Sequence, residues 1–385
     1  MKYDRKNFLL IGNPDSIWVK KYIEKIILPD DQYTVYIADV GQHTEGLFSE
    51  FYHNNGVKIY RLKEKNTKRI PFVSAYMNIK KMGKLLRKQI NPAIVHAHYI
   101  TWQSMFLLGC LKNKNTVTVA SYWGSDILRE SKSKLTICRL WIGKVDKITL
   151  TTAEMRRKFA ASYGDRYITK IHTPFFGVNG YDTLNDMSHD SGIYKAQYGA
   201  DPENVTVTVG YNGSRAQQHL RALEAINHID KMELRNLFII VPMTYGISDN
   251  KYIDEVADFL RGMNVSGFKV LTDYMNDEES SNLKCVTDIF IHAQTTDAFS
   301  ASVQEFLYAE KIVLNPTWIK YDEHEEKGIF FIKYDSFDNL TSEIEKCIRF
   351  YESGELVSKL KNNNEILKSE TSWEAVTPYW RILYK

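Results

Sequence analysis

Short apolar runs and amphipathic segments alternate through the first half of the chain. Five apolar runs have the length of strands: residues 7–12, 33–38, 57–62, 93–96 and 117–121. Three segments between them carry apolar residues at helical spacing: residues 16–27, 74–89 and 103–111. Such alternation predicts a parallel, doubly wound sheet, whose ligands bind at the carboxyl ends of the strands.

The second half repeats this pattern. Strand-like runs occupy residues 205–209, 237–241, 268–271, 288–292 and 312–314, and helical segments occupy residues 219–228, 252–263 and 301–309. At 385 residues the chain is long enough for two cores. We therefore predict an α/β protein with two Rossmann-like, doubly wound domains that face a central cleft.

A segment rich in Gly, Asn and Ser separates the two series. It begins at 174–180 and continues to about residue 192, and such composition is typical of an interdomain linker. We place the domains at residues 1–178 and 179–370. The last segment, 371–385, starts with Thr371 and Glu374 at capping-box spacing and is expected to form a helix that packs back on the first domain.

Composition places the protein in the cytoplasm. The apolar run 8–11 is too short for a secretory segment, and no stretch approaches the roughly 18 to 20 apolar residues of a membrane helix. The four cysteines lack metal spacing, and we interpret them as reduced, buried thiols.

The net charge of +3 conceals an asymmetry between the halves. Residues 1–185 carry 30 Lys and Arg against 15 Asp and Glu, whereas residues 186–385 carry 20 against 32. The excess is densest over residues 58–88, where eleven basic residues are opposed only by Glu64. This segment is either a solvated helix face or a surface for anionic lipid head groups at the inner face of the membrane. Nucleic acid is not expected as a partner, because no nucleic-acid motif accompanies the charge.

The segment Thr295–Glu305 carries the richest candidate chemistry. A strand ends at His292, a loop of small residues follows, and a helix begins near Ala301, which aims backbone N–H groups at a phosphate. Glu305 is placed one turn into that helix to accept ribose hydroxyls, and Asp297 to accept hydroxyls of a sugar. The alternative is that Asp297 and Ser300 only cap the helix.

A second candidate segment, Val209–Arg215, joins a strand to a helix through a loop with two glycines. Arg215 offers a fork of donors suited to a diphosphate, beside Gly213 and Ser214, and His219 follows one turn later. The alternative is an ordinary turn with an exposed arginine. The segment is not a Walker A loop, and no GxGxxG follows the first strand, so neither ATP nor NAD is predicted.

A third candidate segment, Ser121–Asp126, follows a strand of the first domain. Asp126 is expected to face the cleft, with Trp123 and Ser125 beside it and His98 at the end of the preceding strand. No HExxH, paired CxxC or Asp-rich loop is present, so no bound metal is predicted.

These segments together resemble the retaining glycosyltransferases of the GT4 type, which have the GT-B fold. The family's stretch of an acid, Gly-Phe-Gly and a second Glu eight positions later reads here as Asp297-Ala-Phe-Ser to Glu305. Ala298 and Ser300 replace the two glycines. The resemblance implies that Asp297 contacts the donor sugar, that Glu305 holds the ribose, and that the phosphate binds to the backbone amides of Phe299, Ser300, Ala301 and Ser302.

Other motifs extend the resemblance. Ile94–His98 and Tyr122–Asp126 are similar to first-domain signatures of the family, with Trp123 where a histidine is frequent, and Phe176–Asn179 is similar to its linker entry. The two segments Gly210–His219 and Val241–Gly246 are similar to a second GT-B family. That family comprises the fucosamine transferases that act on lipid-linked precursors of enterobacterial common antigen.

The resemblance implies transfer of a hexose-type sugar from a UDP-, GDP- or TDP-sugar to a glycan, lipid-linked or protein-linked acceptor. We expect surface polysaccharide or glycoconjugate biosynthesis, with retained configuration and without a metal or other cofactor. Base contacts are expected from the loop 272–275, with Tyr274 and Met275, and Tyr245 is a further donor contact.

Asp126 is the candidate base if the reaction inverts configuration. The alternatives are a nucleotide-sugar 2-epimerase, which shares the fold, and a non-catalytic glycosyltransferase-like accessory subunit.

Overall fold

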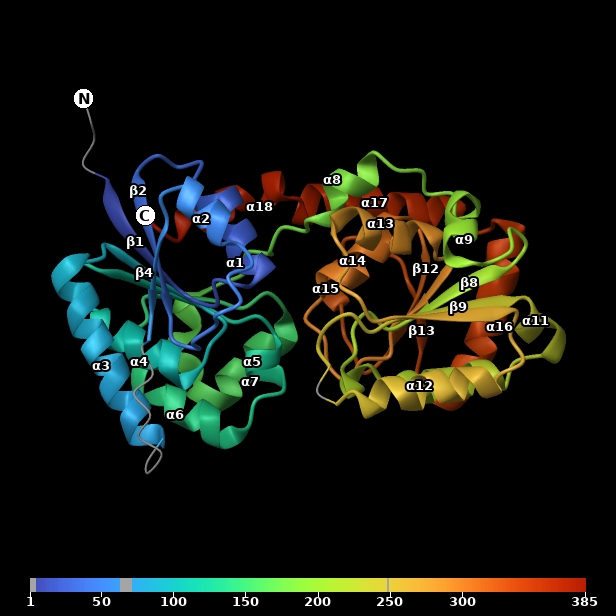
Figure 1. Cartoon of the computed structure of the whole chain (residues 1–385), viewed down its shortest axis with the longest axis horizontal. Coiled ribbons are helices and arrows are strands. Elements are labelled where there is room, and N and C mark those ends of the chain that lie inside the picture. The colour runs from blue at the N-terminus through green and yellow to red at the C-terminus, as the bar shows by residue number, and fades with distance from the viewer. Residues whose placement is uncertain (1–4, 63–70, 248) are drawn as a thin grey trace. The chain divides into compact units, whose positions relative to one another are not determined.

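The computed structural model describes residues 5–62, 71–247 and 249–385 and divides into two compact units (Figure 1). The first unit comprises the chain up to Phe176 together with Val376–Lys385, and the second comprises Gly177–Ala375. Each unit is built on one parallel sheet with helices on both faces (Figure 1).

In its described residues the first unit holds a seven-stranded parallel sheet in the order β3-β2-β1-β4-β5-β6-β7. The strands are β1 (Lys6–Ile11), β2 (Tyr33–Asp39), β3 (Lys58–Arg61), β4 (Ile94–His98), β5 (Val117–Ser121), β6 (Lys147–Thr149) and β7 (Ile171–His172). The strand order reverses between β1 and β4, which in such sheets leaves a crevice for ligands outside the carboxyl ends.

The helices of the first unit cover both faces of this sheet. They are α1 (Ile17–Tyr22), which continues into one π-helical turn, α2 (Ser49–Asn54), α3 (Pro71–Gln89), α4 (Trp102–Leu111), α5 (Ser125–Leu128), α6 (Lys132–Ile142) and α7 (Ala153–Tyr163). The end of the chain joins them, because the helix α18 (Trp373–Ile382) continues into Tyr384, whose hydroxyl lies 2.7 Å from Nδ1 of His96. Trp380 of the same helix donates from Nε1 to the backbone oxygen of Phe175 at 2.7 Å.

The second unit shows a six-stranded parallel sheet among its described residues, in the order β10-β9-β8-β11-β12-β13. The strands are β8 (Val205–Val209), β9 (Leu237–Pro242), β10 (Gly267–Leu271), β11 (Ile289–Ile291), β12 (Ile312–Pro316) and β13 (Ile332–Tyr334). Every residue of β8, β9, β11 and β12 is buried, as expected for parallel strands covered on both faces. Here the order reverses between β8 and β11.

Two sets of helices cover this second sheet. One apolar core lies under α10 (His219–Asn227), α12 (Lys251–Gly262) and α16 (Phe337–Ser353). The other lies under α8 (Gly180–Asn185), α9 (Gly192–Tyr198), α13 (Asp277–Val286), α14 (Ala301–Tyr308) and α17 (Val357–Thr371). Two short helices, α11 (Lys231–Arg235) and α15 (Asp322–Glu325), complete the unit. The predicted α/β class with two Rossmann-like sheets is confirmed.

The structure bears on two predictions from composition, the reduced cysteines and the lack of a membrane helix. Cys138, Cys285 and Cys347 are buried free thiols, and Cys110 is a half-buried one. Across the described ranges, no helix combines the length and the apolar character that crossing a bilayer requires.

Candidate functional site

The two candidate loops of the second unit meet at the point where its strand order reverses. The loop after β8 and the loop after β11 are joined by the backbone N–H of Thr295, which donates to the oxygen of Ala216 at 2.9 Å. The side chain of Gln217 also donates from Nε2 to Oε1 of Gln294 at 2.5 Å. The motifs at 209–219 and 295–305 therefore form one surface at the carboxyl edge of the sheet.

Asp297 accepts three hydrogen bonds at the centre of this surface. Its carboxylate is 7% exposed and accepts hydrogen bonds from the Tyr211 hydroxyl at 2.9 Å, the Tyr321 hydroxyl at 2.5 Å and the backbone N–H of Ser300 at 2.7 Å. Both oxygens are therefore engaged in fastening the loop to the start of α14. The contact with a donor sugar that the resemblance implies stays a prediction.

The start of α14 has the geometry of an anion site. Ser300 occupies the position before the helix, and its side chain accepts no hydrogen bond from the first turn, so Ala301 and Ser302 begin a turn without a side-chain cap. Phe299 adopts φ of 61°, a left-handed conformation that is uncommon for a bulky residue. Its ring is held by stacking on His324, with the ring centroids 3.7 Å apart. Strained backbone that packing enforces is typical of ligand-binding loops.

Glu305 is fixed in the second turn of α14. Its Oε2 lies 2.9 Å from Nζ of Lys284, and both side chains are largely buried. Gly180 of α8 packs against the same carboxylate, because a Cβ at this glycine would lie 2.7 Å from Oε1 of Glu305. The carboxylate is well positioned, and its contact with a ribose stays a prediction.

Arg215 is engaged by two carboxylates. Its guanidinium donates to both oxygens of Glu255 at 2.8 and 2.9 Å and lies 3.4 Å from Asp249, and it stacks over the Tyr252 ring at 4.3 Å. The hydrogen bonds to Glu255 raise the pKa of Arg215. To bind a diphosphate, the guanidinium must exchange these partners for phosphate oxygens.

His219 supports the glycine loop from beneath. It is fully buried, its Nδ1 lies 3.1 Å from the Tyr252 hydroxyl, and burial lowers its pKa to about 4, so the imidazole is neutral. Gly210 has φ of +68°, and a Cβ there would lie 2.7 Å from Nε2 of His219. This close approach explains why a glycine is needed at this turn.

The remaining predicted donor contacts border the same edge of the sheet. Gly213 donates its N–H to the backbone oxygen of Tyr245 at 2.7 Å, which places the predicted segments 210–215 and 241–246 side by side. Ser214 caps the short helix that follows this loop. Tyr274 is 77% exposed, and with Met275 it borders a cavity of about 360 Å³ that is a candidate for the nucleotide base.

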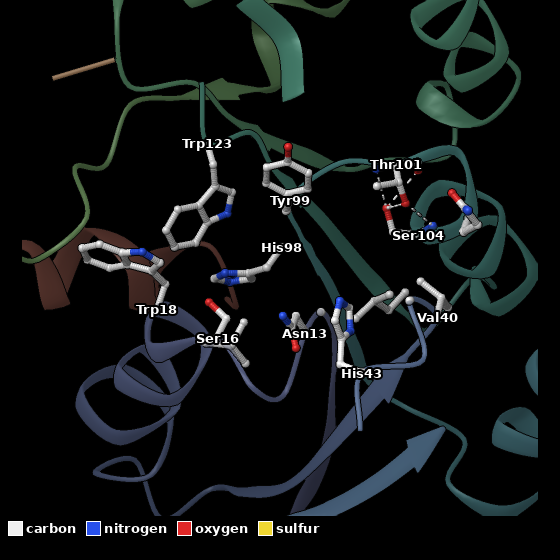
Figure 2. A pocket seen from close by; sticks show the side chains of 15 residues that line it. Asn13, Ser16, Trp18, Val40, His43, His98, Tyr99, Thr101, Ser104 and Trp123 are labelled. Atoms are coloured by element: carbon white, nitrogen blue, oxygen red, sulfur yellow. Dashed lines mark hydrogen bonds between the residues drawn. The ribbon is translucent and has the colours of Figure 1, made fainter. Parts of the chain in front are cut away.

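The first unit contains a cavity of about 410 Å³ at the point where its own strand order reverses (Figure 2). Its walls come from the loops that follow β1, β2, β4 and β5. The side chains drawn and labelled in Figure 2 include Asn13, Ser16, Trp18, His43, His98, Tyr99, Thr101 and Trp123. The predicted cleft residues His98 and Trp123 thus lie on the cavity wall.

His98 is a neutral imidazole on this wall. Burial lowers its pKa to about 3, and neither ring nitrogen has a hydrogen-bond partner among the described residues. The ring packs against Tyr22 and Trp123, with centroid distances of 4.3 and 5.4 Å. Buried nitrogens without partners are unusual in proteins and suit a site where a ligand supplies the hydrogen bonds.

Asp126 is held by backbone donors of two loops, and the predicted contact with the cleft stays a prediction. Its two oxygens accept hydrogen bonds from the backbone N–H groups of Ile100 at 2.7 Å and Trp123 at 2.8 Å, and the side chain is 2% exposed. Burial raises its pKa to about 7. Asp126 does not border the cavity; it ties the loop after β4 to the loop after β5 and so positions Trp123. Ser125 beside it donates to the Tyr99 hydroxyl at 3.2 Å.

A histidine–carboxylate pair at this cavity, His43 and Asp39, was not predicted from the sequence. Asp39 ends β2, is fully buried, and accepts from the backbone N–H groups of Gly41 at 2.9 Å and His43 at 2.8 Å. Its Oδ1 lies 2.9 Å from Nδ1 of His43, whose side chain is 40% exposed. An acid that ends a predicted strand, followed four residues later by a histidine, was the only signal.

Three solved structures show the same fold along the whole chain. A glycosyltransferase from Rickettsia africae ESF-5 is 16% identical with a TM-score of 0.77, covering 100% of this chain and 98% of its own. Anabaena Alr3699/HepE, solved with UDP and glucose, is 13% identical with a TM-score of 0.74, covering 98% and 99%. A UDP-N-acetylglucosamine 2-epimerase is 14% identical with a TM-score of 0.60, covering 99% and 95%. Since transferases and an epimerase share it, the fold alone does not select the reaction.

Matches to two protein-family models identify the class of reaction. A model described as glycosyl transferase 4-like matches residues 8–152. A model described as 4-alpha-L-fucosyltransferase, glycosyl transferase group 56, matches residues 82–292, which is more than half of the chain. The resemblance drawn from the motifs is confirmed: the chain belongs to the group 56 glycosyl transferase family described as 4-alpha-L-fucosyltransferases, and it is a glycosyltransferase of the EC 2.4 class.

Proposed function

We propose that the protein transfers a hexose-type sugar from a nucleoside diphosphate to a glycan or lipid-linked acceptor in surface polysaccharide biosynthesis. The observation that carries the proposal is the meeting of the two motif loops at the reversal of the second sheet, beside the uncapped first turn of α14. The group 56 description makes a fucose-type sugar the first donor to test. Anabaena HepE has also been solved with UDP-glucose, which supports a nucleotide-sugar donor.

The proposed donor site stabilises negative charge where it develops. Breaking the bond between the sugar and the diphosphate leaves an anion on the leaving phosphate. The backbone amides of Phe299, Ala301 and Ser302 are proposed to supply hydrogen-bond donors for this charge. The Ser300 amide already donates to Asp297, and Arg215 adds its guanidinium once it has exchanged Glu255 for the phosphate. The acceptor is proposed to bind in the cavity of the first unit, on the walls formed by Trp123 and His98.

Nucleotide binding is expected to raise the thermal unfolding temperature of the protein. We would measure unfolding with millimolar UDP, GDP, TDP and CMP, since a ligand at about 100 times its Kd adds about 2.7 kcal/mol to the stability. The shift should disappear in Arg215→Ala and weaken in Glu305→Gln, because these side chains are proposed to hold the diphosphate and the ribose. Arg235→Ala, an exposed arginine of the same unit, should keep the full shift. Absence of a shift with every nucleotide would refute the proposed donor site.

The basic segment 58–88 supports a peripheral contact with the inner face of the membrane. Residues 63–70 lie outside the described residues, but α3 shows the exposed basic side chains of Lys80, Lys81 and Lys84 along a helix that also exposes Val73 and Met77. Cationic and apolar side chains on one exposed helix suit an anionic lipid surface.

Membrane contact predicts binding to anionic vesicles. With vesicles containing phosphatidylglycerol, the triple substitution of Lys80, Lys81 and Lys84 by Gln should weaken co-sedimentation roughly 100-fold, from about 1 kcal/mol per lysine near such a surface. A matched triple substitution on α17, at Lys359, Lys361 and Lys368, should leave binding unchanged. Equal weakening by both triple variants would show that only net charge matters.

A further inference from the structure

The cavity of the first unit is lined by an imidazole that can accept a proton, whereas the two predicted carboxylates are engaged by protein donors. Both oxygens of Asp126 and both oxygens of Asp297 already accept hydrogen bonds from protein donors. Neither carboxylate is therefore arranged to take a proton from an acceptor hydroxyl. The ring of His43, in contrast, rises from its loop into the cavity (Figure 2).

The contact between His43 and Asp39 sets the tautomer of the imidazole. The carboxylate is fully buried and lies 2.9 Å from Nδ1, so the proton is held on Nδ1 and the lone pair on Nε2. The same carboxylate accepts the backbone N–H of His43 at 2.8 Å, which fixes the residue at both its backbone and its side chain. A carboxylate in this role orients a histidine as a general base.

The rest of the cavity suits a sugar ring. Trp18 and Trp123 stand with their ring centroids 6.2 Å apart and offer aromatic faces to the apolar side of a pyranose. Asn13, Ser16 and Thr101 add polar side chains to the lining of the cavity. Mostly apolar walls with a few polar groups that fix orientation are typical of small-molecule sites.

We propose that His43, positioned by Asp39, is the general base that deprotonates the acceptor hydroxyl, with the terminal sugar of the acceptor bound against Trp18 and Trp123. This inference rests on the proposed function. The hydroxyl proton passes to Nε2 of His43 as the acceptor oxygen forms a bond to the anomeric carbon of the donor. The bond from that carbon to the phosphate oxygen breaks, and its electron pair leaves with the diphosphate. A base on the acceptor side implies inversion of configuration, in place of the retention expected from the sequence.

Charged groups flank the loop that carries His43. The charged groups near it are Asp39 and Arg61, whose Nε donates to the backbone oxygen of His43 at 2.9 Å and lies 3.8 Å from Asp39. His98, which also lines the cavity, is neutral because burial lowers its pKa to about 3.

Turnover of variants provides the first test. Release of nucleoside diphosphate would be followed from UDP-glucose, GDP-fucose and TDP-hexoses, with decyl glycosides as acceptors. His43→Gln should lower kcat by about 100-fold or more, while the nucleotide-induced thermal shift stays intact because that site lies in the second unit. The control His53→Gln removes an exposed histidine of α2 and should leave kcat unchanged. Asp39→Asn should lower kcat, because an amide that donates to Nδ1 of His43 favours the wrong tautomer.

A binding measurement provides a second test that needs no donor. In protein labelled with ¹⁵N-histidine, decyl glycosides should shift the ring resonances of His43, which are assigned by their loss in His43→Gln, and leave those of His53 in place. Unmoved His43 resonances, a His43→Gln variant with more than a tenth of the wild-type kcat, or a product of retained configuration would each overturn the proposal. Failure of the proposed function itself is seen separately, as the absence of any nucleotide-induced shift.

Discussion

Acidification from pH 7 to pH 5 is expected to destabilise the protein, and the second unit most, because it holds two of the three buried histidines with lowered pKa values. Burial lowers the pKa of His98 to about 3, of His219 to about 4 and of His324 to about 3, whereas a histidine in the unfolded chain titrates near 6.5. Below about pH 6.5 these three histidines are therefore protonated in the unfolded chain but stay neutral in the folded chain. The stability is fully present above about pH 6.5 and falls by about 1.4 kcal/mol per histidine for each pH unit below it. The three histidines together cost roughly 6 kcal/mol by pH 5, about 2 kcal/mol in the first unit and about 4 kcal/mol in the second.

One buried carboxyl group works in the opposite direction. Burial raises the pKa of Asp126 to about 7, above its value of about 3.9 in an unfolded chain. The contribution of Asp126 to stability is fully present below about pH 4 and is lost as the pH rises through 7. Acidification from pH 7 to 5 therefore raises the free energy of unfolding by about 2 kcal/mol through this group. Burial also lowers the pKa of His96 and His292, which adds to the loss. Acid destabilisation therefore dominates.

Urea unfolding at pH 8, 7, 6 and 5, followed by tryptophan fluorescence, measures this loss. His98→Phe is the informative variant, because a phenyl ring keeps the packing against Tyr22 and Trp123 and gives up no hydrogen bond seen among the described residues. At pH 5 it should retain about 2 kcal/mol more of its neutral-pH stability than the wild type does. His228→Gln, at an exposed histidine, should show no such gain. A free energy of unfolding that is equal at pH 7 and pH 5 would contradict the argument.

The central strands could be predicted because both their faces are covered. In β8 the five residues Val-Thr-Val-Thr-Val are all buried, and an uninterrupted run of β-branched residues is the signal that such a strand leaves in the sequence. The edge strands β7 and β13, and β6 next to β7, have two or three residues each and leave no comparable pattern. They were missed because tertiary pairing with a neighbour, and not local composition, makes them strands.

The position of the candidate sites could be predicted, but the partners of their carboxylates could not. Carboxyl ends of neighbouring parallel strands share one edge, so the loops after β8 and β11 had to meet. The direction of Asp126 and Asp297 depends instead on loop conformations such as φ of 107° at Gly124 and 61° at Phe299. Those conformations turn backbone N–H groups toward the carboxylates, and the sequence carries no local signal for them.

His43 is a functional candidate that could not be predicted from the sequence at all. It belongs to no spacing motif, and it reaches the cavity only because β2 lies beside β1 and ends at the same edge of the sheet. Chemistry that is assembled by topology in this way becomes visible only when the sheet order is known.

Replacing Lys195 with Met is expected to destabilise the second unit by about 3–5 kcal/mol. Lys195 and Asp288 are 2% and 3% exposed, and Nζ lies 3.3 Å from Oδ2. The ammonium also donates to the backbone oxygens of Pro202 at 3.1 Å and Asn204 at 2.6 Å. Methionine fills the space but leaves the buried Asp288 carboxylate without its ion-pair partner and two carbonyl oxygens without the Lys195 donor. Loss of a desolvated partner costs more than the pair itself contributes.

The matched control is the exposed pair Lys333 and Glu325, which is shorter at 2.6 Å but has side chains that are 47% and 29% exposed. Lys333→Met should change the free energy of urea unfolding by less than about 1 kcal/mol, because water solvates both charges when the pair is broken. Adding Asp288→Asn to Lys195→Met should recover part of the loss, since the uncompensated buried charge is then removed. Equal losses of unfolding free energy in Lys195→Met and Lys333→Met would mean that burial does not set the energy of these pairs. If the double variant recovers no stability, the cost lies in the two carbonyl oxygens that have lost their donor.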